Sequence, residues 1–133
     1  MIYTICYCST ASATITPQEI KQLMVDSVTW NEAHDIHGAF IYTDGNFFQI
    51  LEGPKELVKP LFENIKSDDR HHMIIKLYEK EIEEYTFDQY ESSFTIADSK
   101  QSMYALKEHL RETSKQNQSR EAVSYLLDKF MAI

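Results

Sequence analysis

The dipeptide Asp44-Gly45 separates two runs of mainly β-forming residues, at positions 37–43 and 46–51. Asp-Gly favours the two-residue turn whose twist matches that of a pair of antiparallel strands. The two runs therefore predict a β-hairpin near the middle of the chain.

A helix is expected before the hairpin, because its start carries three signals. Pro17 suits the first helical position, Thr16 can cap the helix, and Glu19 completes a capping box. One face of the predicted helix carries residues at helical spacing, namely Ile20, Met24, Ser27 and Asn31. Asn31 ends this core-facing stripe with a polar side chain.

The remaining elements follow from similar patterns. Residues 2–8 predict a first strand, residues 73–80 a fourth and residues 85–96 a fifth. A second helix is expected after the hairpin, and Pro60 within it predicts a kink or a late start. The order β-α-β-β-α-β with one further strand predicts an α+β, ferredoxin-like fold. For this chain we expect a mixed five-stranded sheet with two helices on one face.

Two short amphipathic patterns occupy residues 98–133. Their apolar residues are Met103, Leu106 and Leu110 in the first pattern, and Val123, Leu126, Leu127 and Phe130 in the second. Helices of this length are marginal alone, so they are expected to pack on the open face of the sheet or on another chain. The sequence leaves open whether this region is a simple cover, a signal-output element or a dimer surface.

Charge and composition restrict the partners. The 133 residues carry a net charge of −8, so binding to nucleic acid or to an anionic membrane surface is not expected. No secretion signal precedes the first predicted strand, and no apolar run is long enough to cross a membrane. We therefore expect a soluble, cytoplasmic protein.

Metal binding is not expected either. Cys6 and Cys8 lie two apart in the first predicted strand, and no second cysteine pair is present to complete a zinc site. Both are predicted to be reduced thiols. His71 and His72 are adjacent, so their side chains point apart on an extended backbone.

Several segments together resemble the BLUF family, which are blue-light receptors that use FAD. Residues 47–54, Phe-Phe-Gln-Ile-Leu-Glu-Gly-Pro, resemble the central signature of the family. The hairpin at 36–46, the Asp-Arg-His-His sequence at 69–72 and the Ile-Cys-Tyr-Cys-Ser sequence at 5–9 match in the same order and with the family's spacing. The resemblance extends to the fifth predicted strand and implies a domain at residues 1–97, followed by a helical extension.

The resemblance implies roles for three polar residues. Tyr7 matches the photoactive tyrosine, and Gln49 matches the glutamine that bridges this tyrosine and the flavin. Asn31 matches the asparagine that hydrogen-bonds the carbonyl edge of the flavin. The expected cofactor is FAD, with FMN as an alternative, and its ring is expected between the two helices.

Four further residues are assigned to the cofactor. Ile36, Phe48 and Ile65 are expected to line the flavin ring, although each would also serve as ordinary core. Arg70 either reaches a phosphate or the ribityl chain of FAD, or pairs with a neighbouring aspartate. The sequence does not decide between these uses of Arg70.

The expected activity is light sensing without turnover of a substrate. An excited flavin is a strong oxidant, so Tyr7 can give up an electron and then a proton. Gln49 carries a donor and an acceptor on one planar group and therefore offers two hydrogen-bond patterns. Light supplies the driving energy, so no enzymatic acid, base or nucleophile is required. A flavin-dependent enzyme is disfavoured, because no Gly-rich phosphate loop is present.

The sequence departs from the family in the fifth predicted strand. The family's Trp and Met, which relay the signal, correspond here to Tyr90 and Ser92. This departure leaves open a second interpretation, a light-insensitive member that acts as a protein-interaction module. In either case the expected partner is a separate downstream protein, and a homo-oligomer is expected.

Overall fold

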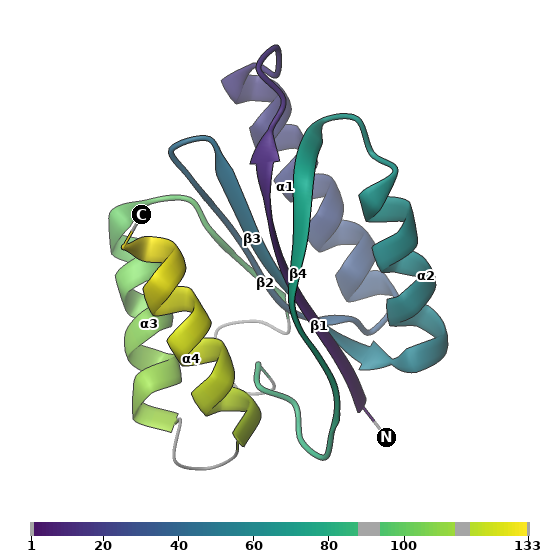
Figure 1. Ribbon diagram of the computed structural model, residues 1–133, viewed down its shortest axis with the longest axis vertical. Helices are drawn as coiled ribbons and strands as arrows, with labels where there is room; N and C mark the ends of the chain where they lie inside the picture. The colour runs from purple at the N-terminus through teal and green to yellow at the C-terminus, as the bar shows by residue number, and fades with distance from the viewer. Residues whose placement is uncertain (1, 88–93, 114–117, 133) are drawn as a thin grey trace.

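A mixed five-stranded sheet in the order β4-β1-β3-β2-β5 forms the centre of the molecule (Figure 1). The computed structural model describes residues 2–87, 94–113 and 118–132. The strands are β1 (Ile2–Ala11), β2 (His37–Thr43), β3 (Asn46–Pro54), β4 (His71–Ile82) and β5 (Phe94–Ala97). The helices are α1 (Pro17–Ala33), α2 (Lys55–Lys66), α3 (Lys100–Thr113) and α4 (Gln118–Met131). The predicted α+β architecture is confirmed.

The central hairpin forms at the predicted turn. Thr43 pairs with Asn46 across β2 and β3, which are antiparallel. Asp44 and Gly45 have φ values of 49° and 84°, and this left-handed conformation at both positions is what a type I′ turn requires. On its other side β3 pairs with β1, also antiparallel, while β5 joins β2 in parallel. The hairpin thus holds β1 and β5 on opposite sides.

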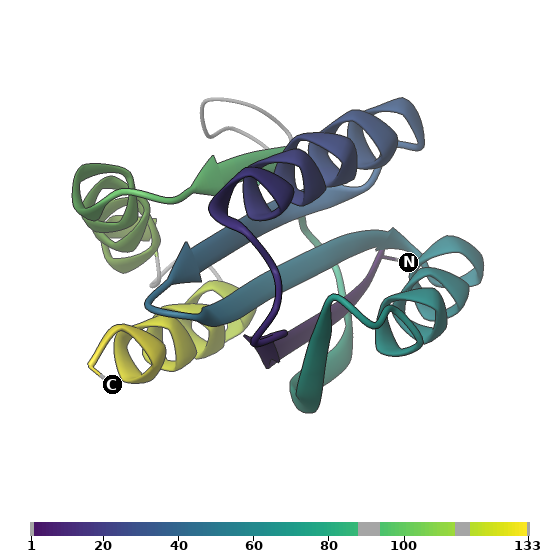
Figure 2. The same ribbon diagram turned by 90° about the horizontal axis from the view of Figure 1, so that it is seen from above.

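Helices α1 and α2 cover one face of this sheet (Figure 2). The Thr16 hydroxyl oxygen accepts from the Glu19 backbone N–H at 3.1 Å, and the Glu19 carboxylate accepts from the Thr16 N–H at 3.0 Å. The predicted capping box is therefore present. Of the two effects expected of Pro60, a kink or a late start, the late start does not occur, since α2 begins at Lys55 and contains Pro60. Burial of Val58 and Phe62 on either side of Pro60 offsets the lost backbone hydrogen bond.

Helices α3 and α4 cover the opposite face of the sheet (Figure 2). All the predicted apolar residues of these helices pack in one cluster with the sheet. The ring of Phe130 lies 5.1 Å from that of Phe48, centroid to centroid. The free thiols Cys6 and Cys8 belong to the same layer. Among the described helices, none is both long and apolar enough to span a membrane.

The fifth strand does not begin at residue 85 as predicted. Residues 85–87 are not extended in the sheet, and the described part of the strand is Phe94–Ala97. The backbone N–H groups of Thr86 and Phe87 instead donate to the Glu52 carboxylate, at 2.9 and 3.3 Å. A buried carboxylate thus takes the hydrogen bonds that a strand ladder would have used.

Replacing Glu52 with glutamine is expected to remove a decline in stability with rising pH. Burial raises the pKa of the Glu52 carboxyl from 4.5 to about 7, while the bonds from Thr86 and Phe87 and the charge of Arg120 act to lower it. Between these two values the folded chain keeps a proton that the unfolded chain has lost. The free energy of unfolding therefore falls as pH rises through this window, by roughly 3 kcal/mol in total.

Urea unfolding of the wild type and of Glu52→Gln, at about pH 5 and about pH 8, measures this decline. The matched control is Glu56→Gln, which changes an exposed glutamate of α2 and should keep the wild-type decline. An equal decline in Glu52→Gln would contradict the prediction.

Candidate functional site

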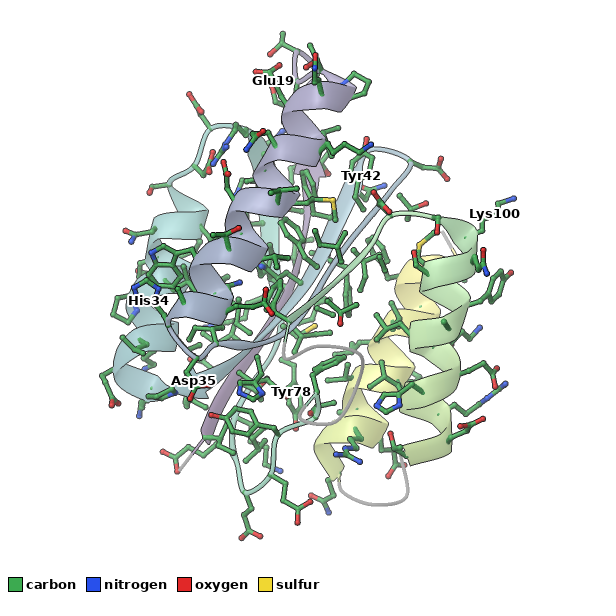
Figure 3. The ribbon with its side chains drawn as sticks, turned by 180° about the vertical axis from the view of Figure 1, so that it is seen from behind. Glu19, His34, Asp35, Tyr42, Tyr78 and Lys100 are labelled. Carbon is green, nitrogen blue, oxygen red and sulfur yellow. The ribbon has the colours of Figure 1, made fainter. Side chains whose placement is uncertain are left out.

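A groove lies between α1 and α2 above the sheet, with a volume of about 290 Å³. Its walls include Leu23 and Asn31 of α1, Leu61 and Ile65 of α2, and Arg70 after α2. We call this space the α1–α2 groove. Figure 3 shows α1 in front of the sheet, with Glu19 and His34 marking its two ends. Apolar walls with a few convergent polar groups are typical of small-molecule sites.

The groove adjoins a smaller inner cavity of about 40 Å³ against the sheet. Its walls include Tyr7, Phe40, Phe47, Gln49 and His71. Gln49 lines both spaces and therefore stands where the groove meets the inner cavity.

Tyr7 and Gln49 form a buried hydrogen-bonded pair at this junction. They lie directly opposite each other on the antiparallel strands β1 and β3, so both side chains point to the face covered by α1 and α2. The Tyr7 hydroxyl donates to the Oε1 atom of Gln49. The two side chains are 1% and 2% exposed, so water cannot compete for this bond.

Burial raises the pKa of the Tyr7 phenol well above its usual value, and the neighbouring Cys6 and Asp68 raise it further. Tyr7 therefore keeps its proton at any ordinary pH and acts as a hydrogen-bond donor. A phenol in this position loses its proton only when the ring has first been oxidised.

Asn31 reaches the groove from the C-terminal end of α1. Its side chain is 2% exposed. Its backbone carbonyl accepts from the N–H groups of Ile36, at 2.8 Å, and His34, at 3.2 Å, which fixes the end of the helix. The amide of Asn31 and that of Gln49 each offer a donor and an acceptor to the same space.

Not all the apolar residues assigned to the flavin from the sequence lie in the walls of the site. Ile65 lines the α1–α2 groove, whereas Ile36 is fully buried against Gly53 and lies outside the walls of the groove. The assignment of Phe48 is corrected, because this ring points to the opposite face and packs on α4. Side chains alternate along a strand, so Phe47 is the residue that lines the inner cavity.

Arg70 lies at the edge of the groove and is paired with Asp68. The guanidinium Nε and Nη2 atoms donate to the carboxylate at 3.0 and 2.6 Å. This pairing is one of the uses expected from the sequence. The bonds from Arg70 lower the pKa of the Asp68 carboxyl, so the pair remains ionised and nearly neutral overall.

His71 is a wall of the inner cavity that the sequence did not reveal as a site residue. Its Nε2 atom donates to the Ile65 carbonyl at 2.6 Å, since a carbonyl can only accept. In the neutral ring Nδ1 then accepts from the Ser9 hydroxyl at 2.7 Å. The ring stands edge-on to Tyr7, 6.2 Å between centroids. No spacing rule predicts this arrangement, because it joins β1, α2 and β4. The relay positions Tyr90 and Ser92 lie outside the described residues.

The chemistry of the walls fits a flat heteroaromatic ring that carries adjacent N–H and C=O groups. Two amides can each give and take a hydrogen bond, and an oxidisable phenol adjoins one of them. A family model described as sensors of blue-light using FAD matches residues 2–93 of this chain.

Known relatives agree with that match. The blue light- and temperature-regulated antirepressor BluF of Escherichia coli (strain K12) is 33% identical over 60 residues, which are 45% of this chain and 15% of that protein. The chain spans 7% to 15% of the lengths of the curated relatives it matches.

Solved structures share the fold over most of the chain. The photo-activated state of BlsA superposes with a TM-score of 0.72 and 25% identity, over 97% of this chain and 94% of the other. Klebsiella pneumoniae BlrP1, solved with FMN and cyclic diGMP, gives a TM-score of 0.75 and 25% identity, over 96% of this chain and 35% of the other.

Proposed function

The chain belongs to the BLUF family of sensors of blue light that use FAD, and from this we propose that it is a photoreceptor whose flavin binds in the α1–α2 groove. The observation that carries the proposal is the buried Tyr7–Gln49 hydrogen bond at the junction of the groove and the inner cavity. It places an oxidisable phenol beside an amide that has two possible hydrogen-bond patterns.

Three side chains would hold the ring. The amides of Asn31 and Gln49 line the groove and would pair with the polar edge of the flavin, while Ile65 would pack on the ring. Bound flavin, once excited by blue light, supplies an acceptor for one electron.

The groups of the chain then respond in order. Tyr7 would give up one electron to that acceptor, and the proton of its oxidised phenol would follow to the same acceptor through the amide of Gln49. Without that donor, Oε1 of Gln49 would lose its hydrogen-bond partner. The side chain would then turn and adopt a second hydrogen-bond pattern. When Tyr7 regains its electron and proton, Gln49 remains in the new pattern, which is the signal.

We take the cofactor to be FAD, with FMN as the alternative. The amides of Asn31 and Gln49 would bind only the flavin ring, which FAD and FMN have in common. Arg70 stands at the edge of the groove, but its pairing with Asp68 occupies much of its donor capacity. This pairing weakens any preference for a diphosphate.

The output is proposed to run through the sheet to a separate protein. In this scheme residues 1–97 form the flavin-binding domain and residues 98–133 form a helical extension, in a cytoplasmic homo-oligomer. Helices α3 and α4 lie on the sheet face opposite the groove, so a change in β3 reaches them directly. A light-insensitive interaction module is disfavoured, since the Tyr7–Gln49 pair is present. Signalling by a changed hydrogen bond requires no enzymatic turnover.

An absorption spectrum of the purified protein, in the dark and just after blue light, tests the proposal. We expect oxidised flavin to be bound, with a small red shift after illumination that reverses in the dark. Bound flavin without a shift would indicate a member that has lost its light response. Failure to bind flavin after reconstitution with excess FAD would refute the proposal.

A further inference from the structure

Glu52 is a fully buried carboxylate on the strand that carries Gln49. It follows Gln49 by three positions in β3, so the two side chains point to opposite faces of the sheet. Gln49 faces the groove and Glu52 faces the layer of α3 and α4. The exposure of Glu52 is 0%, and such burial of an acid is costly unless it has partners.

The partners of Glu52 come from a segment distant in sequence. Its Oε1 atom accepts from the backbone N–H groups of Thr86 at 2.9 Å and Phe87 at 3.3 Å. Its Oε2 atom is buried and has no hydrogen-bond partner among the residues that the structure describes. The carboxylate therefore holds residues 86–87 through one oxygen, and the other oxygen lies in the protein interior.

The charged and titratable groups around Glu52 come from three elements and the adjoining loop. Arg120 of α4 acts on Glu52 as a nearby positive charge, and Cys6 of β1 lies within its electrostatic reach. His37 of β2 pairs with Glu52 across the strands, and its ring stacks on that of Tyr85 at 3.8 Å between centroids.

The loop of residues 85–87 is also bonded to α4. Arg120 donates from Nη2 to the Tyr85 carbonyl at 3.2 Å. Residues 85–87 are therefore bonded to β3 through Glu52 and to α4 through Arg120. A displacement of β3 beside Gln49 thus has a direct path, through bonded groups, to this loop and to α4.

We propose that Glu52 is a positioning residue that couples the Gln49 strand to the 85–87 loop and to α4, and that its ionisation sets how long the light-induced state lasts. The proposal rests on the photoreceptor function proposed above. Hydrogen bonds to an ionised carboxylate are roughly twice as strong as those to a neutral one. Protonation of Glu52 therefore loosens the loop and also removes the attraction of Arg120.

Both forms of Glu52 occur under ordinary conditions. Burial holds the pKa of its carboxyl at about 7, despite the opposing effects of Thr86, Phe87 and Arg120. The strength of the hydrogen bonds that hold residues 86–87 to Glu52 should therefore change around neutral pH. A rate that depends on this coupling should titrate with the same midpoint.

The test is the rate of dark recovery after a blue-light pulse, measured between about pH 5.5 and about pH 8.5. In the wild type we expect the rate to change by about fivefold with a midpoint near neutrality. Glu52→Gln should make the profile flat. Arg120→Gln removes a charge that lowers the Glu52 pKa, so the midpoint should move to higher pH. Glu79→Gln, at a glutamate of β4 that accepts from Tyr3, is the matched control and should keep the wild-type midpoint.

Three results would overturn the coupling role while leaving the photoreceptor function intact. These are a flat wild-type profile with a normal red shift, an unchanged titration in Glu52→Gln, and an unmoved midpoint in Arg120→Gln. If Glu52→Gln does not fold, the wild-type profile and Arg120→Gln still decide the matter. Absence of any red shift in the wild type would overturn both proposals.

Discussion

Replacing Tyr7 with phenylalanine is expected to abolish the light-induced red shift while flavin remains bound. The phenol is the group that donates to Gln49, and in the proposed mechanism its ring is the electron donor. Phenylalanine keeps the ring volume but is far harder to oxidise and has no proton to give. Gln49 loses its donor, so the free energy of unfolding should fall by about 1–3 kcal/mol. Absorption spectra before and after a blue-light pulse measure the shift.

Tyr3→Phe is the matched control for this experiment. Tyr3 lies on the same strand and the same face as Tyr7, but its hydroxyl donates to Glu79 rather than to Gln49. Its loss should leave the red shift intact. A normal light response in Tyr7→Phe would refute the assigned role of Tyr7.

Replacing Gly38 with alanine is expected to be the most destabilising single substitution considered for this protein. Gly38 has a φ of +145°, and a Cβ atom there would lie 1.9 Å from the backbone oxygen of Ile50. Backbone cannot move aside as a flexible side chain can, so β2 and β3 would have to separate. We expect a loss of about 4 kcal/mol or more in the free energy of unfolding. Ile50 adjoins Gln49, so surviving folded protein should also bind flavin more weakly.

Gly45→Ala separates the two causes of this loss. Gly45 also has positive φ, at +84°, but a Cβ atom there would meet nothing within 4 Å. Only the conformational cost remains, about 1–2 kcal/mol. Urea unfolding followed by circular dichroism compares the two variants. If the two variants lost the same free energy of unfolding, the close approach of Gly38 to the Ile50 backbone would not be the cause of the larger loss expected at Gly38.

Much of the fold followed from local signals. The Asp44-Gly45 turn and the capping box at Thr16 and Glu19 were readable because each depends on residues only a few positions apart. The order of elements then left few ways to arrange one sheet, and the predicted mixed five-stranded sheet forms, with the strand order β4-β1-β3-β2-β5. Tyr7, Asn31 and Gln49 were assigned through the resemblance, and the structure brings all three to one side of the sheet.

The identity of the phenylalanine in the site required the tertiary structure. Alternation along β3 shows that Phe47 and Phe48 point to opposite faces, but it does not show which face carries the groove. Both residues are buried, at 1% and 0% exposure, because helices cover both faces of the sheet. Hydrophobicity therefore could not distinguish a ring in the cavity from a ring under α4.

Local sequence patterns were enough to predict the hairpin, the start of α1 and the order of the elements, and the resemblance supplied the residue types of the site. The burial of Glu52 and the path of residues 85–87 became evident only in the tertiary structure. A glutamate in a strand is ordinarily solvated, and β-forming residues such as Tyr85 and Phe87 ordinarily extend a strand. Here α4 and the loop close over Glu52, and the loop's amides bond to its carboxylate instead of to a neighbouring strand. Such a choice depends on contacts between positions far apart in the chain, which no local pattern contains.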